Sequence, residues 1–98
     1  MSFEQALDAS LAAALGDDQA LVAELRGVFL DSARKHFLAL TDAATGAEWR
    51  DAALRLKGLA ASFGAESLME AAGRAAESRA ADKDRLDAVE RALVVLAL

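Results

Sequence analysis

The chain of 98 residues contains no cysteine and no proline, and only 5% of its residues are aromatic. Without cysteine, the fold has neither disulfides nor thiolate metal ligands to stabilise it. Without proline, no helix is interrupted by a residue that lacks a backbone N–H. The length suits one compact domain, so we expect residues 1–98 to form a single unit stabilised by its own hydrophobic core.

Basic residues are in the minority, because 11 Lys and Arg stand against 16 Asp and Glu and the formal net charge is −5. This charge disfavours phosphate backbones and anionic lipid, so we expect neither nucleic acid nor membranes as partners. The longest apolar run, residues 92–98, is far shorter than the roughly 20 residues of a membrane span. The N-terminus also lacks a basic segment followed by a long apolar one, and we therefore expect a cytoplasmic protein.

Alanine and leucine are abundant, which favours helix nearly everywhere, and no segment has the pattern of a strand. Apolar residues recur at helical spacing in five segments. These are a short helix from Ser2 to Gly16, the longest helix from Asp17–Asp18 to the Thr45-Gly46 break, a third from about Glu48 to Gly64, a fourth along Leu68, Ala72, Ala75 and Arg79, and a fifth after Asp82 and Asp84.

Short connections between long helices make consecutive helices antiparallel. We therefore expect an all-α fold, an up-and-down antiparallel four-helix bundle with a short additional N-terminal helix. The strongest apolar stripes predict a common core that contains Leu25, Phe29, Trp49, Leu56 and Phe63.

Few residues can carry catalysis, since the chain has no Cys, no Tyr and a single histidine, His36. A di-iron site of the helical-bundle type needs an acidic residue three positions before the histidine, and Ala33 occupies that position. The acidic residues at the expected helix starts, Asp17, Asp18, Asp82 and Asp84, are interpreted as helix caps rather than cation ligands. We expect neither a metal site nor a cofactor.

His36 lies within the apolar stripe of the second helix, and packing at the edge of the core explains its place. An alternative function for it is phosphorylation. Counted outward from the turn, His36 should lie at the height of Leu54 to Leu56 on the antiparallel third helix.

The outer face of the third helix carries the most specific pattern. At 100° per residue Leu54 points about 160° away from Leu56, so it should face solvent. It shares that face with Arg50, Lys57, Gly58 and Ala61, a small apolar spot beside positive charge. Such a surface suits a partner that has an acidic pocket, although single exposed leucines are common and Gly58 also suits close helix packing.

The run Ala52–Ala65 resembles the signature of histidine-containing phosphotransfer (HPt) domains, His-x-Leu-Lys-Gly-Ser followed by Gly-Ala. Five residues match in register: Leu56, Lys57, Gly58, Gly64 and Ala65. The resemblance implies a bundle that passes phosphoryl groups between an Asp of response-regulator receiver domains and an exposed His on this helix. It also implies that Lys57 helps to neutralise the phosphate and that Gly58 clears the approach.

The sequence departs from this signature where the chemistry would occur, because Leu54 occupies the phospho-acceptor position and Leu59 replaces the Ser. The resemblance therefore implies a pseudo-HPt module of two-component signalling, not an enzyme. Such a module docks a receiver domain or a histidine kinase through Arg50, Leu54, Lys57, Gly58 and Ala61 without relaying phosphate. Two alternatives remain: an active phosphotransfer protein that uses His36, and a structural homodimer joined through Leu54 and its neighbours.

Overall fold

The structure, a computed structural model, describes residues 11–13, 16 and 18–97. Its long helices are α2 (Gln19–Thr41), α3 (Gly46–Phe63), α4 (Glu66–Glu77) and α5 (Lys83–Ala97). No strand occurs among the described residues, and the all-α fold class is confirmed. Residues 11–13 are helical, whereas the rest of the helix expected from Ser2 lies outside the described residues apart from Gly16, which lies in a turn.

Acidic side chains cap the starts of two helices. The Asp18 carboxylate accepts a 3.0 Å hydrogen bond from the backbone N–H of Leu21 at the start of α2. The Asp82 carboxylate accepts a 3.2 Å bond from the N–H of Arg85 in α5. The capping interpretation is therefore confirmed for Asp18 and Asp82, because these carboxylates satisfy N–H groups that have no partner within the helix. Asp84 lies within the first turn of α5, and Asp17 lies outside the described residues.

A threonine cap starts α3 at Gly46, two residues before the expected position. The Thr45 hydroxyl accepts a 3.1 Å hydrogen bond from the N–H of Glu48, whose carboxylate in turn accepts a 2.8 Å bond from the N–H of Ala44. This reciprocal arrangement is close to a capping box. At its other end α3 stops at Gly64, whose φ of 73° is the left-handed conformation that glycine adopts readily.

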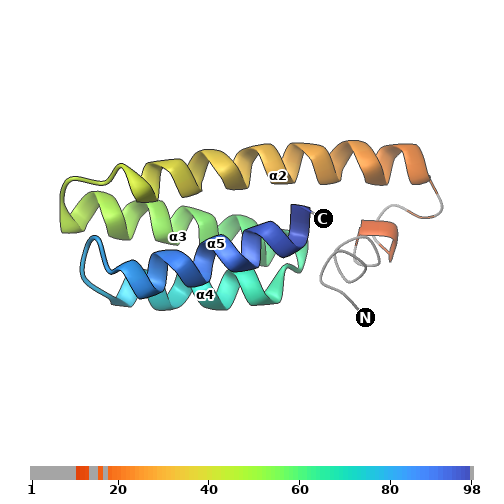
Figure 1. Ribbon diagram of the computed structural model, residues 1–98. Helices are drawn as coiled ribbons and strands as arrows, with labels where there is room; N and C mark the ends of the chain where they lie inside the picture. The colour runs from red at the N-terminus through yellow and green to blue at the C-terminus, as the bar shows by residue number, and fades with distance from the viewer. Residues whose placement is uncertain (1–10, 14–15, 17, 98) are drawn as a thin grey trace.

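The four long helices lie side by side in Figure 1, and the chain turns back at each connection between them. Helix α3 packs against α2 and α4, and α5 packs against α4 and α2. The side chains in the common core include Phe29, Ala33, Leu40, Trp49, Leu56, Leu68, Val89 and Leu96. None of the described helices is long and apolar enough to cross a bilayer.

Two of the five predicted core residues are less buried than expected. Phe63 is only partly buried, although its ring lies 4.8 Å from that of Phe29 between centroids. Leu25 is also only partly buried, whereas Leu30, which was not predicted, is buried. The prediction that Leu25 is a core residue is wrong, because it lies one turn beyond the contact that Phe29 makes with the last residue of α3.

The fourth helix is shorter than its apolar stripe indicated. It ends at Glu77, so Arg79 is not helical and is exposed in the connection to α5. The same connection contains Ala81, which has a φ of 61°. This left-handed residue lets the chain turn within a few residues and start α5 beside α4.

Candidate docking surface on helix α3

Leu54 lies on the outer side of α3. The opposite side of this helix is the buried one and contributes Trp49, Ala53, Leu56 and Ala60 to the core. Leu54 is 41% exposed, as its position in the helical repeat predicts. An apolar side chain is thus presented to solvent near the middle of α3.

A strip without bulky side chains continues from Leu54 toward the end of α3. Gly58 lies one turn after Leu54 and Ala61 one further turn along, and both are exposed. A Cβ atom added at Gly58 would have no neighbour within 4 Å, so no contact within the described fold requires a glycine there. The nearby Ser62 hydroxyl donates a 2.9 Å hydrogen bond back to the Gly58 carbonyl. The surface beside Leu54 is therefore low and open.

Lys57 lies along the border between α3 and α4. Its Cδ and Cε atoms would be 3.6 Å from a Cβ atom at Gly73 of α4, so its aliphatic stem passes directly over that glycine. Lys57 and Gly73 also line a surface hollow of about 300 Å³ together with Glu70, Arg74 and Glu77. The ammonium group thus belongs to a mixed-charge border beside the Leu54 strip.

Arg50 reaches α4 as well. Its Nη1 atom donates a 3.3 Å hydrogen bond to the Ala76 carbonyl in the last turn of α4. A cation at this position interacts favourably with the carbonyl end of the helix dipole. Of the five predicted docking residues, Leu54, Gly58 and Ala61 form the open strip, and Arg50 and Lys57 lie on its α4 side. We call these five residues the α3 surface.

His36 lies on the other side of α3. It is half-buried and lines a hollow of about 460 Å³ between α2 and α3 that also contains Asp42, Glu48, Asp51 and Arg55. His36 was expected at the level of Leu54 to Leu56 along α3, and it shares this hollow with Arg55, which lies within that range. The Arg55 Nε atom is 2.8 Å from the Asp51 carboxylate, which leaves two further carboxylates in the same hollow. This acidic lining is unfavourable for an incoming phosphoryl group.

The structure does not bring His36 and Lys57 together. Arg55, beside His36, and Lys57 are two residues apart on one helix and thus point about 160° away from each other. The contact of Lys57 with Gly73 was not predicted either. A glycine in the middle of a helical stripe was the signal that would have indicated it, since such a glycine marks a close approach by a neighbour.

The α3 surface combines an apolar contact with positive charge. Leu54, Gly58 and Ala61 carry no nucleophile, and Lys57 and Arg50 supply positive charge. Across the described part of the chain, no group of three or more His, Asp or Glu side chains is arranged to hold a metal ion.

Comparison with known proteins identifies no relative: no protein-family model, no curated protein and no solved structure matches this chain.

Proposed function

We propose that this chain is a pseudo-HPt module: an up-and-down four-helix bundle of the HPt type that docks a receiver domain or a histidine kinase and does not relay phosphate. In this proposal the α3 surface is the docking site, and Leu54 occupies the position from which an HPt histidine would accept a phosphoryl group. The proposal rests on the resemblance of residues 52–65 to the HPt signature together with the exposure of Leu54.

The single observation that carries the proposal is that Leu54 is exposed beside an open glycine. A leucine that served only the core would be buried, and a glycine needed only for helix packing would have a neighbour above it. Leu54 is 41% exposed, and no atom lies within 4 Å of a Cβ placed at Gly58. An apolar contact flanked by Lys57 and Arg50 complements a partner whose acidic pocket has an apolar rim.

The test is a gain of chemistry in the variant Leu54→His. Receiver domains from the source organism are phosphorylated with radiolabelled acetyl phosphate and mixed with the native chain and the variant. In the expected reaction an imidazole nitrogen of the new histidine attacks phosphorus, the N–P bond forms, and the P–O bond to the receiver aspartate breaks and leaves its carboxylate. We expect label on the variant from at least one receiver that binds the native chain, and none on the native chain.

Leu54→Gln is the matched control, because it replaces the leucine with a polar side chain of similar size that has no nucleophilic nitrogen. Label on Leu54→Gln would mean that the phosphoryl group is transferred to a residue other than residue 54. If no receiver and no histidine kinase binds the native chain, the proposal is wrong. If receivers bind but Leu54→His stays unlabelled, docking is retained and the phosphotransfer geometry is not.

The two alternatives give different results in the same set of measurements. Label on the native chain that disappears in His36→Ala would establish the active phosphotransfer protein in place of the pseudo-HPt module. The structural homodimer would be established if sedimentation showed a concentration-dependent dimer that is lost in Leu54→Glu, and if the chain bound neither a receiver domain nor a histidine kinase.

A further inference from the structure

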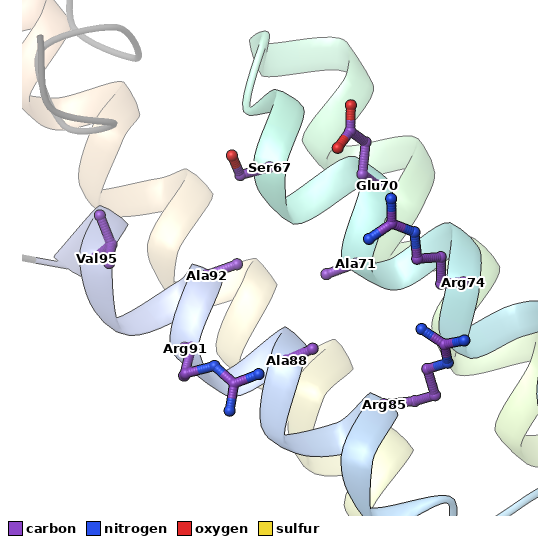
Figure 2. A pocket seen from close by; sticks show the side chains of 9 residues that line it. All are labelled: Ser67, Glu70, Ala71, Arg74, Arg85, Ala88, Arg91, Ala92 and Val95. Atoms are coloured by element: carbon purple, nitrogen blue, oxygen red, sulfur yellow. The ribbon is translucent and has the colours of Figure 1, made fainter.

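A groove separates α4 from α5 on a side of the molecule that the α3 surface does not include. It has a volume of about 330 Å³, and its lining is shown in Figure 2. Three alanines lie along it, Ala71 from α4 and Ala88 and Ala92 from α5. Their side chains are only partly buried.

Three arginines line this groove. Arg74 comes from α4, and Arg85 and Arg91 come from α5, with Arg85 reaching from α5 across the groove toward α4 (Figure 2). All three are exposed. Within the described part of the chain none of them makes an ion pair or a hydrogen bond through its side chain, even though Glu70 lines the same groove one turn before Arg74.

This concentration of positive charge runs against the composition of the chain. The protein carries a net charge of −5, yet the groove gathers three guanidinium groups and a single carboxylate. Like charges brought together without a counter-charge repel one another. A guanidinium group offers a planar fork of donors that matches carboxylate oxygens in pairs. The excess of guanidinium groups over carboxylates in the groove therefore favours an anionic ligand.

The surroundings of the groove limit the kind of anion. Beside Arg91 the outer side of α5 presents Asp87 and Glu90, which line the adjoining hollow together with Val94 and Val95. A long polyanion such as a nucleic acid would extend past the arginines onto these carboxylates. A short segment that places its carboxylates on the arginines and its apolar side chains on the alanines and on Val95 would avoid them.

We propose that the α4–α5 groove binds an acidic segment of a partner protein, with carboxylates on Arg74, Arg85 and Arg91 and small apolar side chains on Ala71, Ala88 and Ala92. This site shares Arg74 with the hollow that Lys57 lines at the edge of the α3 surface, whereas Arg85 and Arg91 lie outside that hollow. It does not depend on the HPt resemblance. It gives the chain a second contact that recognises a partner by charge and by the spacing of its carboxylates.

The test uses a fluorescently labelled peptide in which glutamate alternates with alanine and leucine, and a control peptide with glutamine in place of every glutamate. Binding to the full chain is measured by fluorescence anisotropy at low and at physiological salt. We expect the glutamate peptide to bind, the glutamine peptide not to bind, and the affinity to fall as salt screens the arginines. The amide resonances of Ala71, Ala88 and Ala92 should shift in NMR titrations with the glutamate peptide.

The double variant Arg74→Glu, Arg85→Glu should bind the glutamate peptide about tenfold more weakly or worse, since two attractive contacts become repulsive. The control is Arg34→Glu on α2, which reverses the charge of one exposed arginine outside the groove. It is compared with the single variant Arg85→Glu, which makes the same change of charge inside the groove. If the double variant loses its helical circular dichroism, the single variant Arg85→Gln replaces it, with a smaller loss expected.

Three results would overturn the proposal. The first is equal binding of the two peptides. The second is an equal loss of affinity in Arg85→Glu and in the Arg34→Glu control, which would mean that the total charge rather than the groove is responsible. The third is tighter binding of duplex DNA or of anionic phospholipid vesicles, abolished by the double variant, which would reassign the groove to that class of partner.

Discussion

The indole Nε1 of Trp49 donates a 2.7 Å hydrogen bond to the carbonyl of Ala75 and thereby joins the first turn of α3 to the last turn of α4. The same carbonyl also accepts bonds from the backbone N–H of Ser78, at 3.1 Å, and from the Ser78 hydroxyl, at 2.8 Å. Arg50 bonds to the next carbonyl, that of Ala76. The last turn of α4 is therefore held by α3 on one side and by its own cap on the other.

Trp49→Phe should lower the free energy of unfolding by about 1–2 kcal/mol. The change removes one buried hydrogen bond and part of a side chain that is 2% exposed, but the Ala75 carbonyl keeps its two bonds from Ser78. Urea denaturation followed by circular dichroism measures the effect. Ser78→Ala is the comparison and should cost less, since it removes one hydroxyl that is only partly buried. A larger loss in Ser78→Ala than in Trp49→Phe would contradict this account.

Arg26→Met should also destabilise the protein, by about 1–2 kcal/mol, because a charged hydrogen bond across the helices is lost. The Arg26 Nη2 atom donates a 3.1 Å bond to the Leu96 carbonyl and so joins α2 to the end of α5. The control is Arg34→Met. Arg34 is exposed, and its Nη1 atom lies 3.7 Å from Oδ1 of Asp31 on the same helix. Such an exposed pair contributes about 0.5 kcal/mol or less. Equal losses in the two variants would refute the role of the Leu96 contact.

Gly58→Ala should raise the free energy of unfolding by about 0.5–1 kcal/mol, because a glycine inside a helix costs backbone entropy. No atom lies within 4 Å of the added Cβ. Gly27→Ala in α2 is matched, since Gly27 is exposed, helical and equally free of neighbours. Both variants should shift the urea midpoint upward. A destabilised Gly58→Ala beside a stabilised Gly27→Ala would mean that the fold itself needs the glycine.

Gly58→Glu and Lys57→Glu should weaken binding of a receiver domain about tenfold without unfolding the bundle. The first change fills the open strip beside Leu54, and the second reverses a charge on its border. Gly27→Glu introduces the same side chain on α2 and should leave the affinity unchanged. Titration calorimetry measures the three variants with one receiver. Unchanged affinity in both α3 variants would exclude the α3 surface as the docking site.

The helices could be predicted because apolar periodicity and capping chemistry are local properties. Asp18 and Gly64 mark helix ends in the sequence as they do in the structure. The degree of burial was harder to predict, since it depends on where a neighbouring helix stops. Leu25 lies one turn before Phe29 on α2. Because α3 ends at Phe63, beside Phe29, Leu25 has fewer α3 side chains to pack against than Phe29 has.

In the candidate site too, the local features could be predicted from the sequence, whereas the contacts between helices could not. The exposure of Leu54 follows from the period of α3 alone, and it is confirmed. The contacts of Lys57 with Gly73 and of Arg50 with Ala76 depend on how α4 is positioned along α3, which the periodicity of one helix does not encode. The alanines of α4 differ in the same way: Ala72 and Ala75 are buried, whereas Ala71 lines the groove between α4 and α5.

Trp49 also gives the protein a built-in optical probe. It is the sole tryptophan, and the chain has no tyrosine, so nearly all intrinsic near-ultraviolet fluorescence arises from one indole between α3 and α4. That indole is sheltered from water and lies in the same helix as Leu54, so its emission wavelength reports the integrity of this helix pair. The unfolding of every variant discussed above except Trp49→Phe can therefore be followed in solution without attaching a dye. The same emission distinguishes separation of α3 from α4 from fraying at the far ends of α2 and α5.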